Sequence, residues 1–207
     1  MSIAESSIVP GSGALGVSAE GVARRFGTVH AVEHIDFHAP AGKVTALIGP
    51  NGAGKTTLLL MLASLLRPDS GTIRINGLDP LRDSAAARLQ IGWMPDTLGV
   101  WESLTAREIL VQMARFYRLP KAGIVHRVSG LLELVRLDGL ADQPARVLSR
   151  GQQQRLSLAR ALIHDPSVLL LDACVRPRSG IPGGAPNPAA PPGRGREGRG
   201  GFLPRAQ

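Results

Sequence analysis

The chain of 207 residues has one cysteine, Cys174, and only 3% aromatic residues. A single cysteine excludes an internal disulfide framework and is typical of a reducing cytosol. The longest apolar run near a helix, residues 58–66, is too short to span a bilayer, which needs roughly 20 residues. Residues 1–16 lack the basic start and apolar block of a secretory signal. We therefore expect a cytoplasmic protein with no transmembrane segment of its own.

Most of the formal charge of +8 belongs to the C-terminal end, because residues 173–207 hold six arginines and one acid. The remaining charge is unremarkable for a domain, so no nucleic-acid partner is expected. The same stretch has seven prolines and eight glycines, a composition that cannot bury enough apolar area to offset chain entropy. We expect a disordered tail over residues 173–207 and a flexible leader over residues 1–15.

The region between leader and tail begins β-rich, continues as strand, loop and helix, and ends with a helical insert and a strand. This order predicts an α/β fold with a helical subdomain at about residues 97–150. Buried strands are expected at residues 43–48 and 167–172, and Asn-Gly predicts a turn after a strand at 71–76. The remaining expected elements are strands at 29–32 and 35–37 and helices at 56–66, from 105 to a stop at Pro120, 125–135 and 152–164.

Residues 49–56 match the phosphate-binding pattern G-x-x-x-x-G-K-[ST] in full, between an expected strand and an expected helix. Glycines let successive backbone amides turn toward an anion, and the following helix adds its positive end. The lysine supplies charge for the outer phosphates, and the threonine hydroxyl can bind Mg²⁺. The alternative is a glycine-rich turn without a ligand. The candidate ATP-binding residues here are Gly49, Pro50, Asn51, Gly52, Ala53, Gly54, Lys55, Thr56 and Thr57.

Residues 148–155, Leu-Ser-Arg-Gly-Gln-Gln-Gln-Arg, resemble the signature of ABC ATPases, usually written LSGGQ, with Arg150 at the usual first glycine. The resemblance covers about residues 17–172. It implies a P-loop NTPase core with an N-terminal antiparallel β subdomain and a helical subdomain. It also implies that Ser149, Arg150, Gly151 and Gln152 face ATP held by a second subunit. The alternative is that Ser149 caps an ordinary helix.

Two further positions follow from the resemblance. Phe26 stands where the family has an aromatic residue that stacks on adenine, and the alternative is a phenylalanine that packs in the core or on an edge strand. Asp96 stands where the family usually has a glutamine. An acid there could approach Mg²⁺ or the attacking water, but when ionised it cannot donate a hydrogen bond.

The last expected strand resembles the Walker B strand, whose acid, Asp172, would hold Mg²⁺ through a water. The family continues with Glu-Pro-(Thr/Ala)-Ser-Gly-Leu-Asp, and this chain has Ala173 at the position of the catalytic glutamate. Removing two nucleotides from a plausible codon series for the family motif reproduces residues 172–179, which suggests a frameshift after Walker B. The later family histidine is absent, since none follows His164. The C-terminal part of the fold would then be missing and residues 173–207 out of frame.

The resemblance implies an ATP-binding subunit that powers transport, working with a membrane subunit and a second ATP-binding subunit, as a homodimer or a mixed pair. Its place would be the cytoplasmic face of the membrane. The segment from Trp101 to Glu108 resembles bacterial exporters. One alternative is a nucleotide-binding fragment or pseudogene product without turnover. Another is a non-transport ABC ATPase acting on DNA or ribosomes, disfavoured by the short distance between Lys55 and Ser149 and the single cassette.

Overall fold

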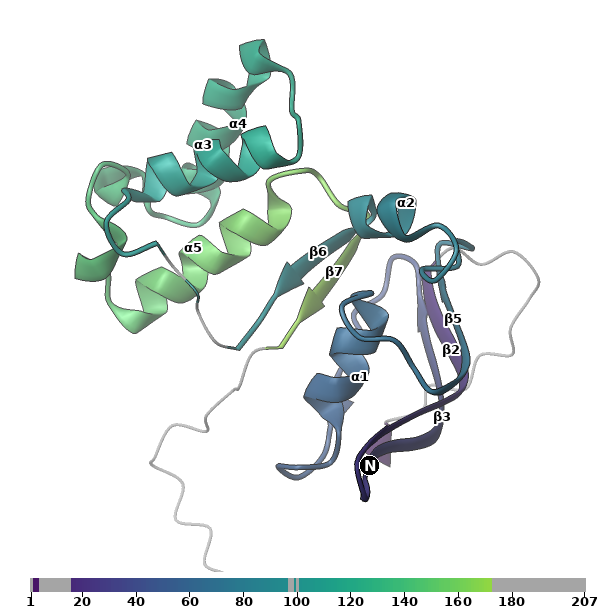
Figure 1. Cartoon of the computed structure of the whole chain (residues 1–207). Coiled ribbons are helices and arrows are strands. Elements are labelled where there is room, and N and C mark those ends of the chain that lie inside the picture. The colour runs from purple at the N-terminus through teal and green to yellow at the C-terminus, as the bar shows by residue number, and fades with distance from the viewer. Residues whose placement is uncertain (1, 4–15, 97–98, 100, 173–207) are drawn as a thin grey trace, which may run out of the picture. The chain divides into compact units, whose positions relative to one another are not determined.

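A three-stranded antiparallel sheet forms the N-terminal part of the chain in the computed structural model, which describes residues 2–3, 16–96, 99 and 101–172 (Figure 1). Strand β2 (Gly16–Phe26) lies between β3 (Val29–Pro40) and β5 (Ser70–Ile75). The expected N-terminal antiparallel β subdomain is therefore present. The two short strands expected at 29–32 and 35–37 are one continuous strand. The expected tail, and the leader apart from residues 2–3, lie outside the described residues.

Two turns of this sheet follow from local sequence. Gly27, with φ 59°, lies in the two-residue connection between β2 and β3. Asn76 and Gly77 follow β5 with φ values of 49° and 82°, and the backbone groups of Ile75 and Leu78 bond across them. Positive φ at both central positions is what Asn-Gly favours. The expected strand and turn are confirmed here.

Helix α1 (Lys55–Leu62) covers the first hydrophobic core. Its residues Leu58, Met61 and Leu62 are almost completely buried. The helix stops earlier than the expected residue 66, because Ser64 adopts φ 58° and the amide of Leu66 bonds to the carbonyl of Leu60. A left-handed residue and this type of backward bond are common ways to end a helix.

The strand expected at residues 43–48 is largely absent, and the expectation that it is buried was wrong. Only β4 (Leu47–Ile48) is a strand, paired antiparallel with β1 (Ser2–Ile3). Val44 is fully exposed and Ile48 is 61% exposed. Among the described residues no strand pairs with positions 43–46, so their apolar side chains have no sheet neighbours to bury them.

Strands β6 (Ile91–Met94) and β7 (Val168–Leu171) form a parallel pair, and α2 (Ser84–Leu89) directly precedes β6 (Figure 1). The expected strand at 167–172 is confirmed, but it is only partly buried: Leu170 is buried, whereas Leu169 and Leu171 are exposed. Within the described part of the chain β7 pairs on one side only, which accounts for the exposure.

The helical subdomain has its own core. It contains α3 (Ala106–Phe116), α4 (Lys121–Leu134), the short helices η1 (Asp138–Leu140) and η2 (Ala145–Val147), and packs on α5 (Arg150–Leu162). The most deeply buried side chains come from all three long helices and the α4–α5 connection: Ile109, Leu110, Leu132, Leu137, Leu156 and Ile163. The helices expected from residues 105, 125 and 152 are thus confirmed, with α4 starting earlier.

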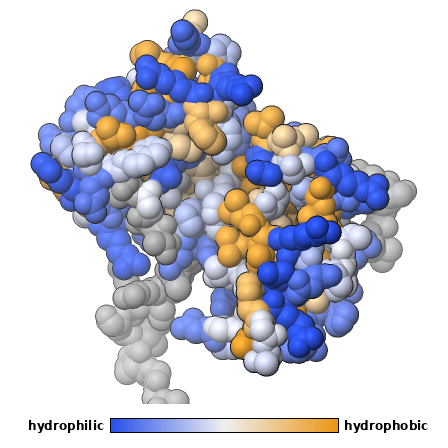
Figure 2. All heavy atoms as spheres, in the orientation of Figure 1, coloured by the Kyte–Doolittle hydropathy of each residue, from blue (hydrophilic) through white to orange (hydrophobic). Residues whose placement is uncertain are grey.

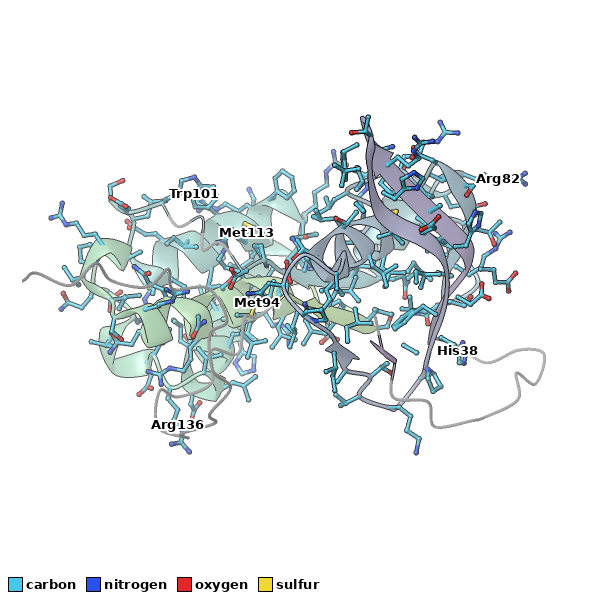
Figure 3. The ribbon with its side chains drawn as sticks, turned by 90° about the horizontal axis from the view of Figure 1, so that it is seen from below. His38, Arg82, Met94, Trp101, Met113 and Arg136 are labelled. Atoms are coloured by element: carbon cyan, nitrogen blue, oxygen red, sulfur yellow. The ribbon has the colours of Figure 1, made fainter. Side chains whose placement is uncertain are left out.

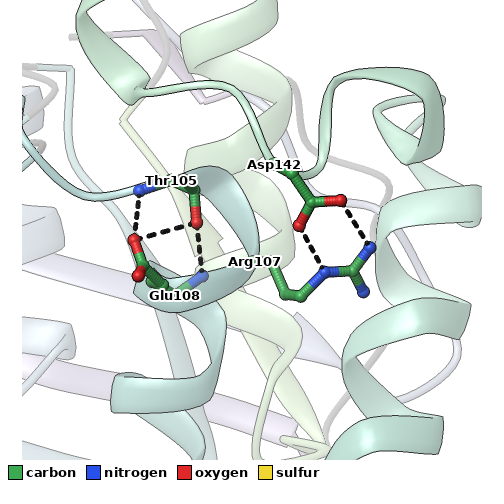
Figure 4. Close-up of polar contacts among 4 residues, drawn as sticks. All are labelled: Thr105, Arg107, Glu108 and Asp142. Atoms are coloured by element: carbon green, nitrogen blue, oxygen red, sulfur yellow. Dashed lines mark hydrogen bonds and ion pairs between the residues drawn. The ribbon is translucent and has the colours of Figure 1, made fainter.

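Capping boxes start α3 and α5. The hydroxyl of Thr105 accepts from the Glu108 amide at 3.1 Å, and the Glu108 carboxylate accepts from the Thr105 amide at 2.8 Å (Figure 4). These hydrogen bonds from Thr105 lower the pKa of Glu108. Beside this cap, Arg107 donates to both carboxylate oxygens of Asp142, which lowers the pKa of Asp142. The pair joins the start of α3 to the segment before η2.

Hydrophobic residues also reach the surface, where Figure 2 shows separate apolar areas between charged ones. The side chains of Leu65, Leu81, Leu89, Phe116 and Leu134 are more than half exposed. None of the helices in the described ranges is long and apolar enough to span a membrane.

Gly92 lies where β6 and α5 approach each other closely. A Cβ added there would lie 2.4 Å from the carbonyl oxygen of Ala161 and 2.8 Å from Pro166. The backbone oxygen cannot move aside without shifting α5. This glycine therefore sets how closely the helix approaches the strand.

We predict that Gly92→Ala lowers the free energy of unfolding by about 1–3 kcal/mol, the usual cost of overpacking. The matched control is Gly130→Ala in α4, where an added Cβ meets no described atom within 4 Å. That change is expected to be neutral or to stabilise by up to about 1 kcal/mol, because alanine is the better helix former. Urea unfolding followed by circular dichroism measures both. Equal effects of the two substitutions would contradict the close packing.

Candidate nucleotide site

The expected phosphate loop is a compact turn leading into α1. Gly52 and Gly54 have φ values of 81° and 80°, which only glycine adopts without strain, and the Ala53 amide bonds to the Pro50 carbonyl. A Cβ on Gly54 would lie 2.1 Å from the carbonyl oxygen of Ala31 in β3, whereas a Cβ on Gly52 would meet no described atom within 4 Å. Gly54 therefore lets the loop pack directly against β3, and the side of the loop at Gly52 is open.

Lys55, the first residue of α1, turns its side chain back over the loop. Its Nζ donates to the carbonyl oxygens of Gly49 at 2.9 Å and Pro50 at 2.7 Å. The ammonium group is thus held beside the loop backbone. An ammonium at this place adds a positive charge to the amides at the start of the helix.

Thr56 and Asp172 meet although 116 residues separate them. The Thr56 hydroxyl donates to Asp172 Oδ1 at 3.2 Å. The amide of Asp172 donates to the carbonyl of Met94 at 2.8 Å, which continues the β6–β7 ladder past β7. The carboxyl ends of two parallel strands and the phosphate loop therefore meet at one edge, the usual place for a ligand in an α/β sheet.

Asp96 follows Met94 by two residues, so β6 directs its backbone toward the same edge. Figure 3 shows Met94 near the middle of the molecule, between the helical part and the N-terminal sheet. Asp96 is not without an interaction partner in the structure.

Ser149 is the N-cap of α5. Its hydroxyl accepts from the Gln152 amide at 3.3 Å, and its own amide donates to Gln152 Oε1 at 2.7 Å. The capping alternative for Ser149 is thus present in this structure. Neither packing nor backbone conformation explains Gly151: its φ is not positive, and an added Cβ would meet no described atom within 4 Å. A glycine in a helix costs about 0.5–1 kcal/mol relative to alanine.

Phe26 is 47% exposed at the end of β2. The guanidinium of Arg24 lies over its ring, 4.9 Å from the centroid. Asp69 forms an ion pair with Arg24 and holds it there. The Asp69 carboxylate also accepts a hydrogen bond from the Arg25 amide. That hydrogen bond is the main cause of the lowered pKa of Asp69, and the charge of Arg24 adds to it. One ring face is occupied in this way, and the exposed remainder of the ring is what a base could contact.

The residues at this edge have the chemical groups that Mg²⁺ and a triphosphate would need. A threonine hydroxyl and a carboxylate are hard oxygen ligands, and the open side of Gly52 leaves space for an anion beside the loop amides. The described residues contain no group of three or more His, Cys, Asp or Glu side chains that could hold a metal by itself. A metal here would depend on water and phosphate oxygens for the rest of its shell, as Mg²⁺ usually does.

A cavity of about 220 Å³ lies elsewhere, between the end of α1, β5 and α2. Met61, Ser64, Ile73 and Arg88 are among its lining residues, and no phosphate-loop residue is. In the phosphate loop, Pro50, Asn51 and Gly52 are exposed at the surface. Ala173, at the position of the catalytic glutamate, lies outside the described residues.

These features define an α/β protein with a phosphate loop opposite the acid of a parallel strand. The family model "ABC transporter" matches residues 32–176, and the chain belongs to this family. The resemblance carried by the phosphate loop and the signature is therefore confirmed.

Relatives of both transport directions are similar to this chain. A Nod factor export ATP-binding protein I of Ralstonia nicotianae is 40% identical over 164 residues, which are 79% of this chain and 51% of the relative. A sulfate/thiosulfate import ATP-binding protein CysA of Mycobacterium bovis is 44% identical over 149 residues, 72% of this chain and 42% of the relative. The chain thus spans about half the length of these relatives.

Two solved structures agree with the fold. An ATP-binding subunit of an ABC transporter superposes with a TM-score of 0.67 at 28% identity, covering 74% of this chain and 64% of that chain. CbiO1 of Clostridium perfringens, described as part of the ABC transporter complex cbiONQ, has the same TM-score at 27% identity, covering 75% and 64%. The expected fold class is confirmed by these neighbours.

One contact near the site has no sequence signal. Arg160 of α5 donates to the Gly99 carbonyl at 2.6 Å, and its guanidinium lies 6.0 Å from the Trp101 ring centroid. The segment after Asp96 is therefore attached to the helix that Ser149 begins. Trp101 lies at the edge of the helical part in Figure 3. Only the fold brings these positions together, since 61 residues separate Arg160 from Gly99.

The loop geometry predicts a difference between two glycines with nearly equal φ. Gly52→Ala adds backbone strain alone, whereas Gly54→Ala adds the same strain and a collision with Ala31. We expect Gly54→Ala to destabilise the chain by roughly 1–3 kcal/mol more than Gly52→Ala, measured by urea unfolding. Equal losses would show that the loop does not rest on β3 as described.

Proposed function

We propose that this chain is the ATP-binding subunit of a membrane transporter. The observation that carries the proposal is the hydrogen bond between Thr56 and Asp172, which sets a Mg²⁺-type oxygen pair beside a complete phosphate loop. Family membership supports the same function, and the relatives named above concern transport in both directions.

In this proposal each part of the loop has a separate task. The amides of residues 49–56 and the start of α1 accept the phosphates, and Lys55 exchanges its carbonyl partners for phosphate oxygens. Thr56 and Asp172 hold Mg²⁺, which when bound supplies charge neutralisation between the phosphates. Asp96 lies near the metal side, and Phe26 offers its free ring area to adenine.

A second ATP-binding subunit would complete the site through Ser149, Arg150, Gly151 and Gln152. The open surroundings of Gly151 support this assignment, because a glycine kept at a cost in helix stability suits a backbone approached from outside the chain. The partners are then a second copy or a paired subunit and a membrane subunit on the cytoplasmic face. No nucleic acid is needed.

Export is the direction we propose, on the Trp101–Glu108 segment alone. Importers match at equal or higher identity, so the comparisons do not favour either direction. The structure of the capping box at Thr105 explains why this segment starts a helix, and it is independent of direction.

We further propose that the chain hydrolyses ATP poorly. Alanine at position 173 can neither accept a proton nor orient a water, and loss of a general base typically costs about 10²–10⁴ in rate. The frameshift hypothesis accounts for this residue and for the composition of residues 173–207. A hydrolysis-deficient nucleotide-binding chain is therefore the second candidate function.

Lys55→Ala tests the binding proposal. We expect ATP affinity to fall roughly 10- to 150-fold, because a charge-assisted hydrogen bond contributes about 1.5–3 kcal/mol. Isothermal titration calorimetry with MgATP measures it. Lys121→Ala, at the start of α4 and away from the loop, is the matched control and should bind as the wild type does. Unchanged affinity in Lys55→Ala would remove the basis of the proposal.

The coding DNA and an ATPase assay test the second part. Inserting two nucleotides after the codon of Asp172 should restore a Glu-Pro-(Thr/Ala)-Ser-Gly-Leu-Asp sequence. The restored chain should hydrolyse ATP about 10²–10⁴ times faster than the present one. A shifted frame without this motif would refute the frameshift, and equal turnover of the two chains would refute the deficiency.

A further inference from the structure

One histidine joins three elements near the end of the signature helix. His164 follows α5, and its ring stacks on Tyr117 at the end of α3, with centroids 3.9 Å apart and ring planes 10° apart. The ring nitrogen Nε2 lies 3.1 Å from the carbonyl oxygen of Ile91, the first residue of β6. A single imidazole therefore contacts the helical part and the strand that leads to Asp96.

The partners of the ring define the tautomer of neutral His164. A carbonyl oxygen only accepts, so Nε2 of His164 carries the hydrogen. The other nitrogen, Nδ1, is buried and has no hydrogen-bond partner among the described residues. It is therefore unprotonated in the neutral ring. Adding a proton would place a charged donor in a position without an acceptor, which is costly.

The charged groups around His164 come from two sides. Arg127 of α4 donates to the Leu162 carbonyl at 2.6 Å and to Asp165 Oδ1 at 3.1 Å. The Asp165 carboxylate, which acts on the imidazole, is thus already paired with a guanidinium. Burial lowers the pKa of His164, the Ile91 carbonyl raises it, Arg127 lowers it and Asp165 raises it, with a net decrease.

Tyr117, on which the His164 ring stacks, stays neutral between pH 5 and 8. Burial raises the pKa of Tyr117, with Arg160 opposing that increase. Arg160 of α5 lies four residues before His164 and donates to the Gly99 carbonyl. The titrating group of this cluster in the range between pH 5 and 8 is therefore the imidazole.

We propose that His164 is a proton-sensitive latch that holds α5, α3 and β6 together when neutral and releases them when protonated. The neutral ring offers one donor to Ile91 and a flat face to Tyr117. The protonated ring must find an acceptor for Nδ1, which requires it to leave the stack for water. The inference goes beyond the proposed function and does not depend on nucleotide binding.

The sign of the pH effect follows from the pKa decrease. The unfolded chain binds the proton at about pH 6.5, and the folded chain only at lower pH, so falling pH favours unfolding. The stabilising effect is fully present above about pH 6.5 and is lost as the pH falls through the folded pKa. Between the two pKa values, the titration of His164 should lower the folding equilibrium constant about tenfold for each unit by which the pH decreases.

Nuclear magnetic resonance tests the latch on the full chain. The imidazole signals of the five histidines are followed from pH 8 to pH 5, with His164 assigned by the signal that disappears in His164→Gln. We expect His164 to titrate below the ordinary histidine value of about 6.5, and the ring signals of the single tyrosine to shift with the same midpoint. A His164 pKa equal to or above about 6.5 overturns the proposal. A Tyr117 ring signal that does not shift at the His164 midpoint also overturns the proposal. That result is expected if a charged imidazole stays stacked on Tyr117.

Stability measurements with a matched pair of variants give a second test. His164→Gln keeps a donor for the Ile91 carbonyl but takes no proton, and His126→Gln changes an exposed histidine of α4. Between pH 7.5 and 5.5 the wild type and His126→Gln should lose stability in parallel, and His164→Gln should lose less. Equal pH dependence in all three chains overturns the latch. The titration of the wild type decides the question even where His164→Gln does not fold.

Discussion

The contact between Thr56 and Asp172 is the constraint on which the proposed site depends. It joins the first turn of α1 to the end of β7, and the bond from the Asp172 amide to Met94 joins β7 to β6 at the same level. Without it the phosphate loop would be a glycine-rich turn with a lysine. With it, a hydroxyl and a carboxylate lie side by side where a metal ion and phosphates can share them.

The phosphate loop is held in place by packing against the backbone of β3. Gly54 rests against the Ala31 carbonyl, and Leu58 and Leu62 anchor α1 in the core beneath the antiparallel sheet. The signature side is anchored separately, through the capping box at Ser149 and the buried Leu156. The N-terminal ends of α1 and α5 are thus each fixed by packing on one side and exposed on the other.

Local signals predicted the elements whose cause is local. The pair Asn76-Gly77 demands a tight turn, and the Thr105–Glu108 and Ser149–Gln152 pairs satisfy helix-start amides from within four residues. The phosphate loop was predicted for the same reason, since its glycines serve its own backbone. Its pairing with Asp172 could be anticipated only because strand ends gather at one edge of an α/β sheet.

Features that depend on distant neighbours were missed. Residues 43–48, which are mostly apolar, predict a buried strand, but burial needs flanking strands, and Val44 has none among the described residues. Nothing in the sequence brings His164 to Tyr117 and Ile91, or Arg160 to Gly99, because packing of α5 on α3 and β6 creates those contacts. The same lack of local signal applies to the Ala31 carbonyl under Gly54.

The most direct test of the metal-and-phosphate site is the effect of Mg²⁺ on ATP affinity in the wild type and in Asp172→Asn, measured by calorimetry with and without a chelator. The account predicts that Mg²⁺ tightens binding to the wild type, and that Asp172→Asn loses most of this gain while binding metal-free ATP as before. A full Mg²⁺ effect retained in Asp172→Asn would contradict it.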